Sequence, residues 1–284
     1  QEIIGVIEVL LEEGHYVMVV TNGTLSRRFD EIAALPGKLL HRLFIKFSFH
    51  YLELVRLDML AVFFANVRKM QQAGVSMTVE ITPSDELIPH IADVQSVCRN
   101  ELGALCHVTI ARDDRTAEIG ILSRFSLDEN KQIWQVFQSE LFDFKSTIFQ
   151  QRRREFCYAG EWSLYLNLST GQLTQCYCGK TLDNIYADPD RPLKLEAIRR
   201  HCTLPHCYNG HAFLTLGTIP ELVTPTYALM RDRLCADGRH WLGPEIRALF
   251  SQKLADHNRQ YTRVQKLKLD AGQAGLKLLS RSKK

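Results

Sequence analysis

Five of the eight cysteines in this chain lie within residues 157–207. They are Cys157, Cys176, Cys178, Cys202 and Cys207. Thiolates are the ligands of both zinc and iron–sulfur centres, and four of them complete either kind of site. Closely spaced cysteines in a chain without a secretory signal indicate metal binding rather than disulfides. We therefore predict a metal site in this stretch.

The neighbouring sequence suggests which cysteines come together. Runs 162–168 and 172–176 flank Gly171 and predict a β-hairpin, which would bring Cys157 and Cys176 to adjacent strand ends. Cys202 and Cys207 would join from a loop after a helix predicted over 193–201. Cys178 either replaces one of these ligands or is a free thiol beside the site.

A structural zinc site is the alternative interpretation, because zinc accepts the same four thiolates. His201, His206 or His211 could then share the ligation. The chain would in that case be a non-catalytic, zinc-stabilised binding module attached to an α/β domain.

The sequence that precedes the clustered cysteines alternates between predicted strands and predicted helices, as in an α/β protein. Apolar, β-rich runs at 16–20, 43–48, 75–82 and 105–111 are joined by helical sequence, including helices expected over 60–73 and 85–102. Continuous apolar runs are typical of parallel strands covered by helices. Cys98, on one of these helices, and Cys106, in a strand, are interpreted as core residues, and Cys235 as structural. The pattern predicts a parallel sheet, open or closed into a barrel.

Polar residues follow each predicted strand, at the edge where α/β proteins bind ligands. Thr21 and Asn22 end the first strand, Ser48 the second, Glu80 the third and Arg112 the fourth. Asn and Gly also favour turns for backbone reasons, so a purely structural role is the alternative for Asn22.

Composition sets broad limits. Apolar residues make up 45% and charged residues 24%, as in ordinary globular proteins, and the formal net charge is +3. Nothing in this charge balance calls for nucleic acid, and no apolar run is long enough to span a bilayer. We expect a cytoplasmic protein. Residues 1–13 already have a helical pattern, so we expect the chain to be a fragment.

These features resemble the radical S-adenosylmethionine (radical SAM) family. The run Thr21-Asn22-Gly23 and the strand-ending Ser48 are similar to the partial βα barrel of that family. The cysteine-rich hairpin, followed by Gly179, Asn184 and Ile185, resembles the auxiliary-cluster extensions called SPASM or twitch, as do the runs 157–160 and 204–211. The resemblance covers residues 1–220.

The resemblance implies a set of cofactors. Thr21, Asn22, Ser48, Glu80 and Arg112 would face S-adenosylmethionine or substrate, and the five clustered cysteines would hold an auxiliary 4Fe–4S cluster. Four ligands, from Cys157, Cys176, Cys202 and Cys207, would suit electron relay, whereas three would leave an iron open to substrate. The three-cysteine loop and the Gly-Gly-Glu-Pro segment that serve the family's catalytic 4Fe–4S cluster are absent from this sequence. S-adenosylmethionine and that second cluster are thus expected only with a missing upstream segment, and this chain alone is expected to be inactive.

The expected organisation has four parts: a partial radical SAM barrel lacking its first βα units (1–125), a linking helix (126–155), a small α+β auxiliary-cluster domain (156–220) and a helical extension (221–284). The resemblance implies a peptide or small-molecule substrate and an electron donor such as flavodoxin or ferredoxin. No catalytic residue is assigned.

Overall fold

The structure is a computed structural model, and the chain divides into two compact units. The first unit contains residues 1–147 and 224–253, and the second contains residues 148–223 and 254–284. The structure describes residues 3–152, 157–177, 179–199, 202, 204–207, 215–217, 219, 222–254, 262–268 and 271–272. In this division residues 224–253 fall in the same unit as residues 1–147, and residues 254–284 fall in the same unit as residues 148–223, while the expected four-part organisation stays a prediction.

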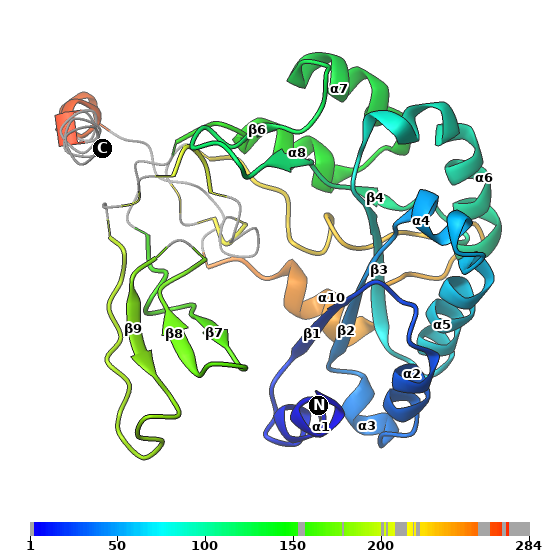
Figure 1. Ribbon diagram of the computed structural model, residues 1–284, viewed down its shortest axis with the longest axis horizontal. Helices are drawn as coiled ribbons and strands as arrows, with labels where there is room; N and C mark the ends of the chain where they lie inside the picture. The colour runs from blue at the N-terminus through cyan, green and yellow to red at the C-terminus, as the bar shows by residue number, and fades with distance from the viewer. Residues whose placement is uncertain are drawn as a thin grey trace. The chain divides into compact units, whose positions relative to one another are not determined.

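A four-stranded parallel sheet forms the centre of the first unit (Figure 1). Its strands are β1 (Val17–Thr21), β2 (Leu43–Ser48), β3 (Ser76–Ile81) and β4 (His107–Val108), and they lie side by side in chain order. The four predicted strands are confirmed, and so is their parallel arrangement.

One helix precedes the first strand, and further helices connect consecutive strands. They are α1 (Ile3–Glu12), α2 (Ser26–Ala33), α3 (Gly37–Leu40), α4 (Tyr51–Arg56), α5 (Leu60–Gln72), the 3-10 helix η1 (Asp85–His90) and α6 (Ile91–Leu102). The predicted helix over 85–102 is divided, because Pro89 lacks the amide hydrogen that a continuous α-helix needs. Gly103, with φ of 72°, ends α6 in the left-handed conformation that glycine adopts without strain.

The two faces of the sheet differ in chemistry. Side chains alternate along each strand, so register partners share a face. One face is apolar and includes Ile45, Phe47 and Val79, with Phe47 packed edge-on against Phe63 of α5. The opposite face carries Phe44 near its amino end and then Lys46, Ser48, Ser76, Thr78, Glu80 and His107. We call this second surface the polar face.

Residues 224–253 pack on the polar face near its amino end. The Gly243 amide donates to Ser76 Oγ (2.9 Å), and the Met77 amide donates to the Trp241 carbonyl (3.0 Å). Phe44 clusters with Ile246 and Phe250 of helix α10 (Pro244–Ser251). Figure 1 shows α10 on one side of the sheet and α2, α5 and α6 on the other.

The expectation of a helix from residue 222 onward is wrong for residues 222–243, which form turns and extended segments. Pro225, Gly238 and Pro244 break that stretch, and Gly238 has a φ of 83°. The helix that was expected to start at Pro244 is confirmed as α10.

A single linking helix was also expected over 126–155. The structure instead has α7 (Leu127–Trp134), the short η2 (Gln135–Phe137) and α8 (Glu140–Ile148). Gln138 has a φ of 49°, and Ser139 Oγ accepts hydrogen bonds from the amides of Phe142 and Val108. The break therefore fixes the start of α8 against β4. Before α7, a short antiparallel pair is formed by β5 (Arg112–Asp113) and β6 (Gly120–Ile121).

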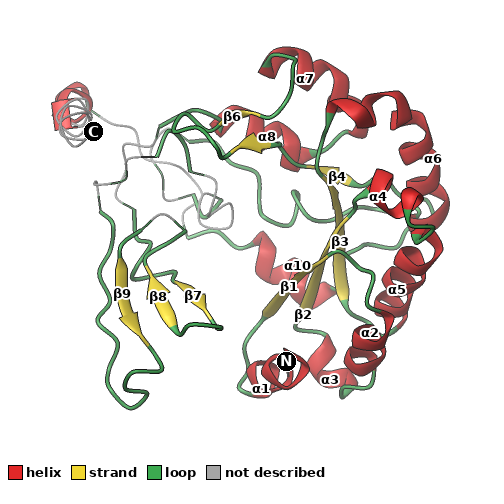
Figure 2. Ribbon diagram, viewed as in Figure 1, coloured by secondary structure: helices red, strands yellow, loops and turns green. Residues whose placement is uncertain are grey.

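The second unit contains a small antiparallel sheet of β7 (Tyr165–Asn167), β8 (Gln172–Thr174) and β9 (Thr181–Asn184) (Figure 2). The predicted hairpin is confirmed, with Gly171 at φ of 73°, whereas β9 was not predicted. The helix expected over 193–201 is wrong for residues 193–199, which are not helical. Their backbone pairs with residues 157–160 instead: Glu196 donates to the Gly160 carbonyl, and Ile198 to the Ala159 carbonyl.

Across the described part of the chain, no helix combines the length and the apolar character needed to cross a bilayer.

Candidate functional site

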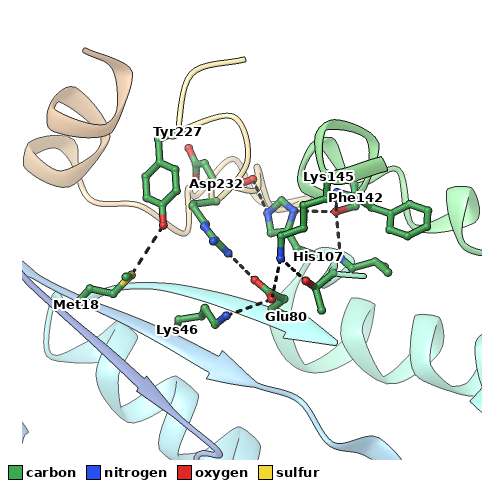
Figure 3. A network of polar contacts seen from close by, with 12 residues as sticks. Met18, Lys46, Glu80, His107, Phe142, Lys145, Tyr227 and Asp232 are labelled. Atoms are coloured by element: carbon green, nitrogen blue, oxygen red, sulfur yellow. Dashed lines mark hydrogen bonds and ion pairs between the residues drawn. The ribbon is translucent and has the colours of Figure 1, made fainter. Parts of the chain in front are cut away.

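Glu80 is the centre of a buried charge cluster on the polar face (Figure 3). Its side chain is 5% exposed and is the third polar residue along β3. One carboxylate oxygen lies 3.1 Å from Lys46 Nζ and 3.9 Å from Lys145 Nζ. The other accepts from Arg231 at 2.5 Å. We call these four residues the Glu80 cluster.

The charge state of Glu80 follows from this environment. Burial alone would raise the pKa of the carboxyl group, but Lys145, Arg231 and Lys46 together hold the pKa well below its usual range. Glu80 is therefore ionised at neutral pH, and it compensates part of the positive charge around it.

Lys145 is the most perturbed base in the Glu80 cluster. It comes from α8, and its ammonium group donates to Thr109 Oγ1. Burial is the main cause that lowers the pKa of Lys145; the Glu80 carboxylate opposes it, Arg231, Lys46 and Arg112 add to the lowering, and the resulting pKa is about 7. A lysine in this state exchanges its proton near neutral pH, as acid–base groups in active sites do.

His107 lies beside Glu80 in the register of β4 and is almost completely buried. One ring nitrogen contacts Ser139 Oγ at 3.3 Å and the other contacts the Asp232 carbonyl at 3.2 Å. Burial, with the charges of Arg233 and Arg231, holds the pKa of His107 well below its ordinary value. The ring is thus neutral and links β4, α8 and residue 232 by hydrogen bonds.

Of the predicted residues, Thr21 is the last residue of β1 and Asn22 follows it directly. Asn22 Oδ1 accepts from the hydroxyl of Thr24 (3.0 Å), and Thr21 Oγ1 accepts from the Gly23 amide (3.2 Å). Gly23 itself has a φ of 75°, and a Cβ there would lie 2.7 Å from the ring of Phe63. These contacts account for the Asn-Gly pair structurally, and they leave the proposed ligand role as a prediction.

The other predicted residues lie near the Glu80 cluster. Ser48 is the register partner of Glu80 and shares its face. Arg112, in β5, is close enough to contribute to the low pKa of Lys145, and its guanidinium lies 3.8 Å from an Asp114 carboxylate oxygen. The structure thus brings Ser48, Glu80 and Arg112 to one region, while Thr21 and Asn22 lie at the end of β1.

In the second unit, four of the five predicted metal ligands influence one another electrostatically. Burial is the largest cause of the raised pKa of the Cys202 thiol, which is about 11, and the thiolates of Cys157, Cys207 and Cys176 contribute to the rise. Burial, with Cys207 and Cys176, likewise raises the pKa of Cys157. Cys178 lies outside the described residues. A cavity of about 430 Å³ is lined by Cys176 and Cys202, together with Gly179, Glu196 and Leu204.

The donor chemistry of this group suits a thiophilic metal centre. Cysteine thiolates are soft ligands, and Cys157, Cys202 and Cys207 are not joined in disulfides. Within the described ranges, however, no three or more His, Cys, Asp or Glu side chains are arranged closely enough to hold a metal ion. The thiols are therefore neighbours at electrostatic range, and ligation would require their side chains to converge further.

The structure describes one of the three histidines that were considered for a zinc site. His206 is buried, and its ring lies 4.7 Å from that of Phe149. His201 and His211 fall outside the described residues.

Lys46, Lys145 and Arg231 were not predicted as site residues. Lys46 carried a usable signal, since it is a charged residue inside an otherwise apolar strand. Arg231 had none, because its partner Glu80 is 151 positions away in the sequence.

Comparison with known proteins gives little further guidance. No family model matches the chain, and no curated protein matches it. Among solved structures, the chain is similar to SuiB of Streptococcus suis, with a TM-score of 0.43 and 10% identity. The similarity covers 68% of this chain and 49% of SuiB, so the chain spans about half the length of that structure. At these values the likeness supports no functional argument.

Proposed function

We propose that this chain is part of a radical SAM enzyme, in which the second unit holds an auxiliary 4Fe–4S cluster. Cys157, Cys176, Cys202 and Cys207 would be its ligands, and Cys178 could replace one of them. The observation that carries the proposal is a unit in which four cysteines influence one another electrostatically and very little apolar core is buried.

The shortage of core is clear from burial. Among the described residues of the second unit, the buried apolar side chains are Ile148, Phe149, Leu173, Cys176, Ala197 and Leu222. A unit with so small a core usually draws stability from disulfides or a metal centre. A metal centre is the device that the clustered cysteines favour.

Thiolate proximity supports the same conclusion. Four thiolates brought together without a cation repel one another, and this repulsion adds to burial, the larger cause, in raising the pKa of Cys202. A bound cation reverses that balance, because it stabilises thiolates and displaces their protons. When bound, a 4Fe–4S cluster supplies one-electron transfer. This chain would supply the ligands and exclude water through the segment 196–199, which pairs with residues 157–160.

The first unit would bind the cofactor or the substrate. Its polar face presents Ser48 and Glu80, with Arg112 close by, at the carboxyl ends of parallel strands, where ligands of α/β proteins bind. Thr21 and Asn22 would contribute from the end of β1. S-adenosylmethionine is the cofactor that the family resemblance implies for these residues.

The proposal also covers the substrate, the electron donor and the cellular compartment. The substrate would be a peptide or a small molecule, the electron donor a flavodoxin or ferredoxin, and the compartment the cytoplasm. Turnover would require the catalytic-cluster motifs that this sequence does not contain.

The experiment is a measurement of iron, sulfide and zinc in the chain purified without oxygen. We expect about four irons and four sulfides per chain. Cys176→Ala and Cys207→Ala should lose the iron, whereas Cys98→Ala and Cys235→Ala, which alter cysteines of the first unit, should keep it. One zinc without sulfide would replace the enzyme proposal with the zinc-stabilised module. Equal iron in all four variants would refute the ligand assignment.

A further inference from the structure

Positive charge exceeds negative charge in the Glu80 cluster. Lys46, Lys145 and Arg231 surround a single carboxylate, and Arg112 adds to the positive potential at Lys145. Arg231 is buried, and its Nε atom has no hydrogen-bond partner within the described chain. Burying unbalanced charge is costly unless a counter-ion enters. The cluster therefore has the positive charge to accommodate a further anion.

The three cations are not equivalent. Arg231 contacts Glu80 at 2.5 Å and Lys46 contacts it at 3.1 Å, both within hydrogen-bonding distance. Lys145 lies 3.9 Å away, beyond that distance, and donates instead to a neutral hydroxyl, that of Thr109. Figure 3 shows Lys145 reaching Glu80 from α8, while Lys46 reaches it from the sheet. Lys145 is thus the cation with the weakest anionic contact.

Charged and titratable groups surround Lys145 on several elements. They are Lys46 on β2, Glu80 on β3, the neutral His107 on β4, Arg112 on β5, Arg231 in the segment 224–253, and Glu140 and Asp143 on its own helix. Positive neighbours outnumber the one carboxylate in contact. An added anion would therefore favour the protonated form of Lys145.

The approach to the cluster lies along β1 and β2. The Lys46 side chain is 21% exposed, and Val20, its register partner on the same face, is 57% exposed. Lys145 is 14% exposed. A ligand can reach the cluster from this side with an apolar portion against Val20 and an anionic group toward the lysines.

We propose that the Glu80 cluster binds the oxyanion of a ligand, a carboxylate or a phosphate group, and that Lys145 takes up one proton as the anion binds. Lys46 and Lys145 would contact the oxyanion, and Glu80 with Arg231 would hold them in place. No covalent bond forms or breaks, and the proton comes from solvent. The inference does not rest on the iron–sulfur proposal, because all of these residues belong to the first unit.

The test follows the lysine side chains by NMR in the full chain labelled with ¹³C at lysine Cε. The signal that disappears in Lys145→Arg is assigned to Lys145, and Lys131→Met, which alters an exposed lysine of α7, serves as the control for assignment. Without added anion, the Lys145 signal should titrate near pH 7. Inorganic phosphate or acetate, at constant ionic strength set with chloride, should raise that midpoint by at least ~1 pH unit, a tenfold preference for the protonated form.

A second variant keeps the test decisive if Lys145→Arg does not fold. In Lys46→Met, the midpoint of Lys145 should rise before any anion is added, because one positive neighbour is gone, and the further shift caused by phosphate should shrink. A shift with phosphate alone identifies a phosphate group as the ligand, a shift with acetate alone identifies a carboxylate, and a shift with both supports a general oxyanion site. No shift with either anion overturns the proposal. The iron content is measured on the same samples, so that failure of this site is distinguished from failure of the cluster.

Discussion

The two units of this protein are stabilised in different ways. The first unit buries a continuous apolar layer in which the ring of Phe47 stacks on Phe29 and packs edge-on against Phe63, and Phe63 in turn stacks on Phe49. The second unit has few buried apolar side chains and many exposed aromatic ones, including the stacked pair Tyr158 and Trp162. Apolar burial is the main source of folding free energy, so the second unit must obtain stability from another source. We therefore expect the cysteines of the second unit to matter for structure as well as for chemistry.

Loss of a cysteine ligand should have the largest effect and should affect only one unit. In Cys176→Ala we expect cleavage within residues 157–199 by a protease to become at least ~100-fold faster, because a bound centre stabilises only the folded form. Residues 17–108 should stay protected. Limited proteolysis followed by mass spectrometry measures both rates. Cys235→Ala is the matched control. Equal cleavage rates in the two variants would contradict the prediction that the second unit depends on Cys176 for its stability.

Breaking the Glu80 cluster should destabilise the first unit without touching the second. Glu80→Gln leaves Arg231 buried without a counter-charge, and we expect it to lower the free energy of unfolding by about 3–5 kcal/mol. Glu53→Gln, which removes an exposed ion pair with Arg56, is the control and should be nearly neutral. Urea denaturation monitored by tryptophan fluorescence gives both values. A small effect at Glu80 would mean that the cluster is well hydrated.

Packing on the apolar face can be tested at the turn after β1. Gly23→Ala combines a left-handed backbone with a Cβ placed 2.7 Å from Phe63, so we expect a loss of about 1–3 kcal/mol. Gly5→Ala is the opposite case, because Gly5 lies within α1 with open space around its Cα. There we expect a gain of about 0.5–1 kcal/mol. Thermal or urea unfolding of both variants provides the comparison.

The last prediction concerns pH. Lys145 has a pKa lowered to about 7 in the folded chain, so between about pH 7 and pH 10 the unfolded chain binds more protons at this residue. The stability of the first unit should therefore rise with pH across this window, by no more than ~1.4 kcal/mol per pH unit. Lys145→Met should remove that slope while Lys131→Met keeps it. Unfolding midpoints measured at pH 7, 8 and 9 decide between the two outcomes.

The sequence alone predicted the local features well and the distant ones poorly. The strands of the sheet and the hairpin at Gly171 were predicted because apolar runs and turn residues are local signals. The helix over 193–201 was wrong because its backbone hydrogen bonds go to residues 157–160, a partner that no local pattern reveals. For the same reason Glu80 was found at a strand end, whereas Arg231, its partner across 151 positions, was not.

The contact between Glu80 and Arg231 also affects the order in which the chain can fold. Residues 148–223 of the second unit are inserted between two parts of the first unit, which is complete only when residues 224–253 have been synthesised. Closing a loop of this length adds little to the equilibrium cost, since each doubling of length costs about 0.6 kcal/mol. It does slow folding, because long-range contacts form late. During translation, Lys46 and Glu80 leave the ribosome well before Arg231, so the carboxylate must remain hydrated until the inserted residues have been made.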